Sequence, residues 1–214
     1  MSLVPVFSPY PTPAVSINYG GDAYTAADAA SYTFTSQPFG TATSDRIICV
    51  GTWNWNYTRT LSSSTIGGVS GTTLVTTGGN HPAVVCHAAV SSGTTGTIVI
   101  NWSGTNSGCH IAVWSVYGAS ASISDTATST NDINPTVASI DCPAHGGVIG
   151  YAIANTGPHA WTGLTEDYDT GPHETHEMSG SHKLFSAAQT SLSVQSLTSA
   201  ATTMRLAVVS YAAA

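Results

Sequence analysis

The sequence predicts an all-β protein: an antiparallel β-sandwich that follows an extended, proline-rich N-terminal arm. Short runs of β-branched and aromatic residues recur at roughly 8–12-residue spacing, as in sandwiches. Gly-, Ser- and Asn-rich clusters such as IGGVSG and SGTNSG separate these runs. No capped segment with helical periodicity exceeds two turns. A jelly roll is the preferred topology and an immunoglobulin-like sandwich is the alternative.

The arm comprises residues 1–15, and residues 16–214 are expected to form a single sandwich domain. Proline rules out a helix in the arm and favours an extended, polyproline-like path. The prolines are Pro5, Pro9, Pro11 and Pro13. The arm also carries apolar side chains that need a surface to lie on, namely Val4, Val6, Phe7 and Tyr10. That surface belongs either to the same domain or to a neighbouring subunit.

The predicted strands follow in chain order from about residue 31. They are SYTFTS, RIICVGTWNW, TLVTT, AVVCHAAV, GTIVINW, HIAVWSVYG, TVASIDC, GVIGYAIAN, KLFSAA, SLSVQSL and TMRLAVVSYA. AYTAADAASY is the one weak helix candidate. No repeat of fixed period is visible, which argues against a solenoid or propeller.

Several predicted strands are apolar on both faces, including RIICV, TIVI and VIGYAIA. A strand of a sandwich has two apolar faces when its outer face is also covered. The cover is an arm, a long loop or another subunit, and we take this pattern as a hint of assembly.

The stretch GTWNWNYTRT places three large aromatic rings on alternate positions of a strand: Trp53, Trp55 and Tyr57. Ile47 and Cys49 share their face, so we expect Trp53 to lie in the core. Trp55 and Tyr57 would extend beyond it, under a loop or into a subunit interface. The alternative is a platform on which sugar rings stack.

The charge composition excludes two classes of partner. Only 7% of the residues are charged, the chain has four Lys and Arg residues, and its net charge is −7. Binding to nucleic acid or to an anionic membrane depends on basic residues, so neither is expected. No apolar run reaches the roughly 18 residues of a membrane span, and no secretory signal is visible. We expect synthesis in a cytoplasm.

The four cysteines, Cys49, Cys86, Cys109 and Cys142, form no closely spaced pair. Cytoplasmic synthesis favours buried free thiols that act as small apolar side chains. Disulfides within or between subunits are the alternative.

The densest polar segment is TEDYDTGPHETHEMSGSHK, residues 165–183. His173 and His176 are three residues apart, whereas the zinc-protease helix needs a spacing of four. A nearby proline and glycine favour a solvated loop; a metal site built from His173, His176 and His182 is the alternative. No G-x-S-x-G or phosphate-binding glycine motif occurs. We expect no cofactor and no enzymatic activity; a metal-dependent or glycosidic enzyme would rest on this segment alone.

Several segments resemble a β-sandwich module of structural proteins from tailed bacteriophages, in particular phages of alphaproteobacteria. They are SYTFTSQPFGTATSDRIICVG, SSSTIGGVSGTTLV, SGTTGTIVINWSG, HIAVWSVYG and HAWTGLTEDYD, and the resemblance covers roughly residues 16 to 212. Three features depart from the module: the His- and Glu-rich segment at residues 173–182, the four cysteines and the proline-rich arm.

The resemblance implies a virion component without enzymatic activity. A capsid decoration (cement) protein on the head surface is preferred, and a tail or fibre component is the alternative. Its partners would be the major capsid protein or tail proteins and further copies of itself, with a trimer compatible with decoration. A glycan-binding adhesin that uses Trp53, Trp55 and Tyr57 is a further alternative.

Overall fold

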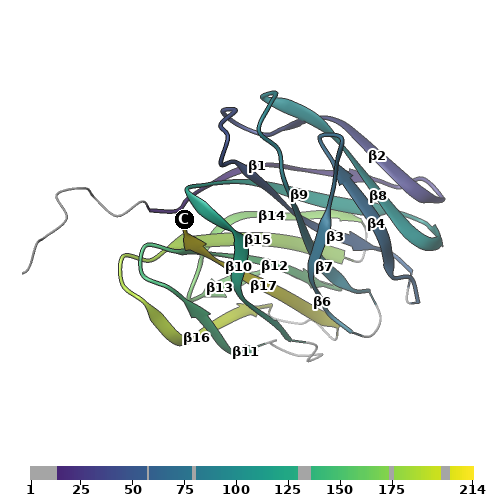
Figure 1. Cartoon of the computed structure of the whole chain (residues 1–214). Coiled ribbons are helices and arrows are strands. Elements are labelled where there is room, and N and C mark those ends of the chain that lie inside the picture. The colour runs from purple at the N-terminus through teal and green to yellow at the C-terminus, as the bar shows by residue number, and fades with distance from the viewer. Residues whose placement is uncertain (1–13, 57, 79–80, 130–135, 174–175, 199–202) are drawn as a thin grey trace, which may run out of the picture.

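The computed structural model describes residues 14–56, 58–78, 81–129, 136–173, 176–198 and 203–214. It confirms the all-β prediction, because the described residues form antiparallel strands and contain no helix (Figure 1). The arm residues Val4, Val6, Phe7 and Tyr10, and Tyr57 of the aromatic run, lie outside the described residues.

The strands fall into two consecutive halves of the chain. The first half contains β1 (Ser16–Thr25), β2 (Ala29–Pro38), β3 (Ile47–Asn54), β4 (Leu61–Ile66), β5 (Val69–Ser70), β6 (Thr72–Thr76), β7 (Ala83–Ala89), β8 (Thr95–Asn106) and β9 (Cys109–Tyr117). The second half contains β10 (Ala119–Ser129), β11 (Thr136–Cys142), β12 (Gly147–Ala154), β13 (Ala160–Thr162), β14 (Thr165–His173), β15 (His176–Leu184), β16 (Gln189–Leu197) and β17 (Met204–Ala213).

The two halves share one strand order. The first half forms the sheets β1-β9-β3-β7-β6 and β2-β8-β4-β5. The second half forms the sheets β10-β17-β12-β15-β14 and β11-β16-β13. In each half the first strand pairs with the last and the second strand with the second-to-last, which is the wrapping of a jelly roll. The residues expected to form a single sandwich are therefore arranged as two jelly-roll sandwiches of the same topology.

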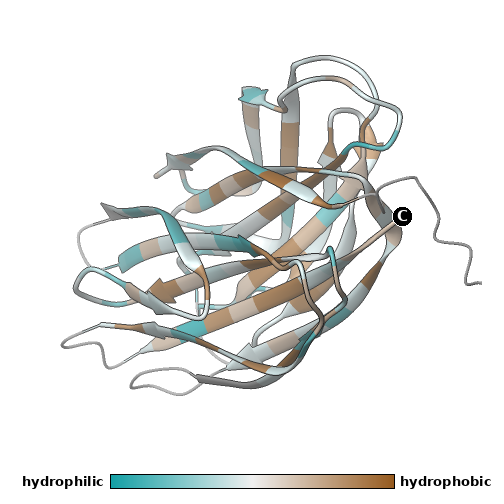
Figure 2. Cartoon of the chain, turned by 90° about the vertical axis from the view of Figure 1, so that its left-hand side faces the viewer, coloured by the Kyte–Doolittle hydropathy of each residue, from teal (hydrophilic) through white to brown (hydrophobic). Residues whose placement is uncertain are grey.

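The four sheets stack as layers, with the first half above the second in the view of Figure 1. The sheets β1-β9-β3-β7-β6 and β10-β17-β12-β15-β14 are the inner sheets, and they face each other. One apolar cluster lies between them, and one lies between each inner sheet and its own outer sheet. Figure 2 shows the resulting concentration of hydrophobic residues on the inner strands. This layering explains why β3, β9, β12 and β17 are apolar on both faces.

The inner sheets meet as two equivalent surfaces do in a twofold dimer. β7 lies against β17, and β6 lies against β10. The reciprocal contacts, between equivalent strands, also occur: Trp114 of β9 lies against Gly180 of β15, and Tyr19 of β1 stacks on Tyr168 of β14. The two halves are thus related by an approximate twofold axis within one chain.

The twofold relation corrects one sequence-based inference. We expected strands apolar on both faces to be covered by an arm, a loop or another subunit. The cover is instead the second sandwich of the same chain, as the cluster shared by Cys49, Trp53, Ile149 and Tyr151 shows. Strand composition therefore gives no support for assembly with other chains.

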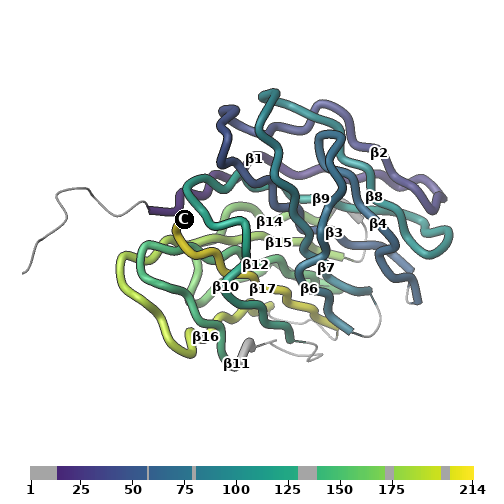
Figure 3. Tube along the Cα trace, viewed as in Figure 1, coloured from purple at the N-terminus to yellow at the C-terminus, as the bar shows by residue number. Residues whose placement is uncertain are grey.

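The junction between the sandwiches is one residue long. Gly118 separates β9 from β10 and has a φ of 64°, a left-handed conformation that favours glycine. Its amide donates to Asp45 Oδ2 at 2.8 Å, and the C-terminal Ala214 amide donates to its carbonyl at 2.9 Å. Figure 3 shows the tube passing between the halves near the C-terminus.

Three local predictions are wrong. The helix candidate at residues 23–32 is instead the end of β1, a short connection and the start of β2. KLFSAA is only the last two residues of β15 followed by a turn. The segment at residues 165–183, expected to be a loop, lies in the hairpin of β14 and β15.

Candidate functional site

The contact between the inner sheets contains the densest group of aromatic and histidine side chains in the described chain. At one end of it, Trp53 stacks on His176 with ring centroids 5.1 Å apart. His81 lies 4.6 Å from His176 by the same measure. Trp53 is completely buried, as predicted, and Ile47 and Cys49 share its cluster.

The aromatic run does not continue as a single strand beyond Asn54. β3 ends at Asn54, whose Oδ1 accepts the amide of Asn56 at 2.9 Å, so the strand period is broken before Trp55. The Trp55 ring turns back edge-on to Trp53, at 6.0 Å, and to His176, at 4.6 Å. Trp55 is half-buried at the rim of this cluster, as expected for a ring beneath a loop or at an interface.

His81 and His176, which meet here, occupy equivalent places in the two halves, as the histidines that follow them show. His87 pairs with the third residue of β3, Cys49, and His182 pairs with the third residue of β12, Ile149. Each is preceded, six residues earlier, by another histidine: His81 and His176 respectively. The spacing H-x5-H therefore occurs twice, in HPAVVCH and HEMSGSH, although sequence reasoning did not identify it as a repeat.

A buried polar chain connects the inner sheets beside this cluster. His110 of β9 is fully buried; its Nδ1 lies 3.0 Å from Tyr151 Oη of β12, and its Nε2 lies 3.4 Å from Asp22 Oδ2. Tyr19 Oη donates to Asp22 Oδ1 at 2.7 Å. A neutral imidazole satisfies both contacts by accepting from Tyr151 and donating to Asp22. Burial lowers the pKa of His110, which favours that neutral form.

The Asp22–His110–Tyr151 chain is a structural connection, not an accessible reaction centre. The Tyr151 side chain is completely buried, and burial raises the pKa of its phenol well above the usual value. The Tyr151 and Tyr168 rings enclose His110, at centroid distances of 6.1 and 6.0 Å. No surface path to the Tyr151 hydroxyl exists for a substrate, because its residue is fully shielded from solvent.

A second polar connection lies farther along the same strands. Trp114 Nε1 of β9 donates to Asp167 Oδ2 of β14 at 2.8 Å. The same carboxylate contacts His182 Nδ1 of β15 at 2.7 Å. The counterpart of His182 in the first half is His87, whose Nδ1 lies 3.4 Å from Tyr211 Oη of β17. The Trp114–Asp167 and His87–Tyr211 contacts fix the position of one sandwich against the other, whereas His182 holds the Asp167 carboxylate from within the second sandwich.

Two glycines allow large rings to cross the contact. A Cβ on Gly51 of β3 would lie 2.5 Å from the Tyr151 ring, and a Cβ on Gly180 of β15 would lie 2.5 Å from the Trp114 ring. Separations this short are not tolerated, so only glycine permits the observed approach. Each half thus provides a glycine at the place where the other half provides an aromatic ring.

The structure does not bring together His176 and His182, two of the three residues of the alternative metal site. His176 faces Trp53, whereas His182, six residues along the same strand, faces Asp167. Six strand residues span about 20 Å, too far for one ion. The His173 side chain lies outside the described residues. Among the side chains that are described, no group of three or more His, Cys, Asp or Glu could hold a metal ion.

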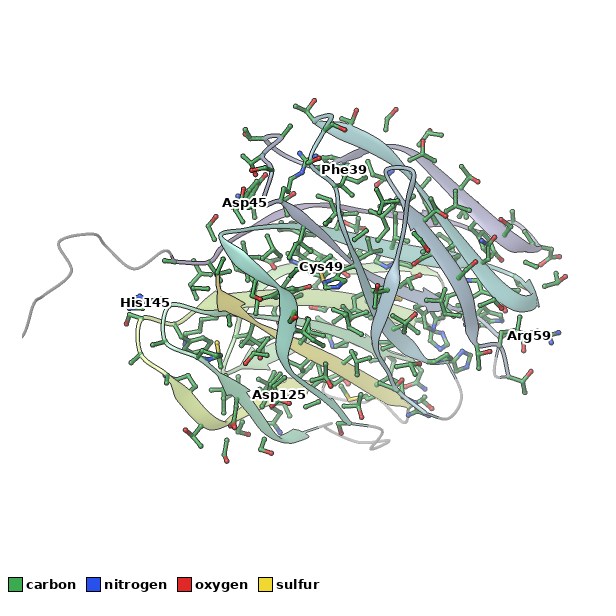
Figure 4. The ribbon with its side chains drawn as sticks, viewed as in Figure 1. Phe39, Asp45, Cys49, Arg59, Asp125 and His145 are labelled. Atoms are coloured by element: carbon green, nitrogen blue, oxygen red, sulfur yellow. The ribbon has the colours of Figure 1, made fainter. Side chains whose placement is uncertain are left out.

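The turn at residues 44–46, with the sequence SDR, is built around a buried arginine. Arg46 is fully buried, and its guanidinium donates to the carbonyls of Phe39, Gly40, Val90 and Ser92 at 2.8–3.1 Å. This arrangement joins two loops at the top of the first sandwich, where Figure 4 labels Phe39 and Asp45. A turn residue of this kind gives no sequence signal that distinguishes it from a solvated arginine.

The cysteines are free and buried, the first of the two alternatives. Burial raises the pKa values of Cys49 and Cys109 to about 12 and those of Cys86 and Cys142 to about 11. Thiols of this kind react slowly because the thiolate is disfavoured.

An apolar pocket lies where the described chain begins. It has a volume of about 320 Å³ and is lined in part by Val15, Gly146, Leu184 and Phe185. The Val15 amide donates to the His145 carbonyl at 2.9 Å, which fixes the first strand beside this pocket. Figure 4 labels His145 near the start of the described chain. Leu184 is 45% exposed and, with Val69, is one of two exposed large apolar side chains among the described residues.

No protein-family model, curated protein or solved structure matches this chain. In the part of the chain that the structure describes, no helix is long and apolar enough to cross a membrane.

Proposed function

We propose that this chain is a non-enzymatic structural protein of a tailed-phage virion, with decoration of the head surface as its role. The resemblance of the quoted segments to phage sandwich modules suggests the virion. The arrangement of the described residues supports a scaffold role, because the buried polar groups at the centre of the molecule connect its two sandwiches and do not line an open cleft.

The observation that carries the proposal is the uncharged outer sheet of the first sandwich. β2, β4, β5 and β8 contain no Asp, Glu, Lys or Arg. Their solvent side presents rows of small, mostly polar residues: Ser31, Asn101 and Ser63 in one row, and Thr33 and Thr65 on either side of the apolar Val99 in the next. Removing neutral hydroxyl groups from water costs less than removing charges, so such a face is suited to contact with a capsid surface.

The test is the copy number of this protein in purified virions, measured by quantitative mass spectrometry against the major capsid protein. A ratio near one, or a simple fraction of it, supports decoration of the whole head. A handful of copies per particle would instead indicate a tail or fibre component. Absence from the particle would overturn the virion proposal.

The adhesin alternative is tested at Trp55, the half-buried ring of the aromatic run. Because Trp55 packs edge-on against Trp53 and His176, Trp55→Ala should lower the free energy of unfolding by about 1–3 kcal/mol. Urea unfolding measures that change, and glycan binding is measured on the same sample. Unchanged stability together with lost binding to a cell-surface glycan would favour an adhesin.

A further inference from the structure

The apolar pocket beside Val15 is the described surface with the clearest capacity to receive another chain segment. Leu184 stands at its rim and is 45% exposed, whereas Phe185 is 9% exposed. Lys183 Nζ lies 5.5 Å from the Phe185 ring centroid. Among the described residues only Val69 is a comparably exposed large apolar side chain, and it is remote in sequence and does not line this pocket.

The sequence that precedes the pocket has matching chemistry. Thirteen residues come before Ala14, and they include Val4, Val6, Phe7 and Tyr10. No charged side chain occurs before Asp22. Insertion of these side chains would therefore carry no side-chain charge of the arm into the apolar pocket.

The arm's own proline pattern argues against occupation of the pocket from which it starts. Ala14 itself lines the pocket, so the arm begins at the rim. Pro9, Pro11 and Pro13 fix φ at alternate positions and disfavour a reversal of direction. A polyproline-like path rises about 3.1 Å per residue, which would carry Phe7 about 19 Å from Pro13.

We infer that the arm segment around Val6, Phe7 and Tyr10 of one copy occupies the Leu184–Phe185 pocket of a second copy. A pocket of about 320 Å³ accommodates one or two side chains of this size. The exchange joins copies through an extended segment, and therefore leaves the face of the outer sheet available for other contacts. The inference deepens the proposed function by naming a second copy as a partner, and it rests on the assembling role but not on the virion.

The test is disulfide trapping in the full chain with the double variant Phe7→Cys/Leu184→Cys. The native cysteines are buried and free, so the unmodified chain is a suitable control for background oxidation. Equal amounts of ¹⁴N- and ¹⁵N-labelled protein are mixed, oxidised mildly and analysed by non-reducing peptide mapping. We expect crosslinked peptides that contain one light and one heavy partner.

The matched control is Phe7→Cys/Val69→Cys, which moves the second thiol to the other exposed apolar residue. Its yield of mixed crosslinks should be at least tenfold lower. Crosslinks within single copies only would show that the arm occupies its own pocket and overturn the inference. Equal yields from both variants, or monomers without crosslinks, would overturn it as well.

The two proposals fail separately. Mixed crosslinks from a protein that is absent from virions would leave the arm exchange standing and remove the proposed function. A capsid-like copy number for a protein whose arm forms no mixed crosslink would do the reverse. The single variant Leu184→Asp, without engineered cysteines, provides an independent measurement. Its charge should shift the protein towards monomers in light scattering, and because the site is exposed, folding should stay intact.

Discussion

The two halves of the molecule share a topology but differ in the side chains that they present to each other. At equivalent positions of β3 and β12 lie Gly51 and Tyr151; at equivalent positions of β9 and β17 lie Trp114 and Val209. A small residue of one half makes room for a large residue of the other: the Tyr151 ring of the second half packs on Gly51 of the first. Two copies of one half would bring two large side chains or two small ones together, so the sequence difference favours pairing within the chain.

The two halves also differ in the ionisable side chains that they bury at equivalent positions. His110 and Arg205 are equivalent, because they pair with the seventh residues of β3 and β12, Trp53 and Ile153. Both side chains are buried, but His110 bonds to Asp22 and Tyr151, whereas Arg205 Nη1 donates to the Met204 carbonyl. The contact between the sandwiches is thus a specific, asymmetric core, and we expect the two halves to unfold together.

The largest effect is expected from Trp114→Ala. Its fully buried ring fills the space above Gly180 and donates to Asp167, so its removal leaves a cavity and removes a hydrogen bond between the two sandwiches. Loss of a buried tryptophan lowers the free energy of unfolding by about 3–5 kcal/mol. Urea unfolding, followed by circular dichroism and fluorescence, should also separate into two transitions, because the sandwiches lose much of their coupling.

The control is Trp102→Ala, which removes a buried ring inside the first sandwich. This variant should shift a single transition to lower urea and leave it cooperative. If Trp114→Ala also unfolds in one transition, the coupling between the halves does not depend on this ring.

A smaller loss is expected when the glycine that faces the Tyr151 ring is replaced by alanine. In Gly51→Ala the added Cβ meets the Tyr151 ring, whose hydroxyl contact with His110 prevents an easy shift. Overpacking of this kind costs about 1–3 kcal/mol. The urea midpoint measures it, with Gly78→Ala as control, since a Cβ there meets nothing within 4 Å. Equal midpoints for the two variants would contradict the tight fit.

Much of the fold follows from the sequence, but the partner of each apolar face does not. Alternation predicted that Ile47, Cys49 and Trp53 share one side of a strand, and they do. The same pattern cannot distinguish a second subunit from a second sandwich, because both bury the face equally. The repeat of topology escaped detection because the halves retain few shared residues, such as His81 and His87 against His176 and His182.

The candidate site was harder to predict than the fold. Trp53 and His176 are far apart in sequence, and only the approach of β3 and β15 across the two inner sheets brings them to 5.1 Å. The segment around His176 was predicted to be a loop because Pro172 precedes it and Gly180 follows it. Its buried serines, Ser179 and Ser181, fit a core because they are small; Ser179 Oγ also donates to the Tyr168 carbonyl. Pro172 and Gly180 in a polar segment therefore led to the wrong assignment of β15.

The subtlest expected effect is a loss of stability in acid, which should depend on the same contact. Burial lowers the pKa values of His81, His87 and His110, and the hydrogen bond from His110 lowers that of Asp22. Below about pH 6.5 the unfolded histidines take up protons that the buried ones do not, so the free energy of unfolding falls as the pH falls. Protonation of Asp22 at still lower pH acts in the same direction, because its folded pKa is depressed as well.

His110→Gln tests whether the contact is the source of this acid sensitivity. Glutamine does not titrate, so the fall in urea midpoint between about pH 7.5 and about pH 5 should be smaller in this variant than in the unmodified protein. His145→Asn is the matched control, since it removes a histidine from a turn outside the contact, and asparagine tolerates the left-handed φ of 62° found there. An unchanged slope in His110→Gln would place the acid sensitivity outside the Asp22–His110–Tyr151 chain. A reduced slope would show that a feature distinguishing the two halves, a histidine at the position where the other half has an arginine, also determines how the protein responds to pH.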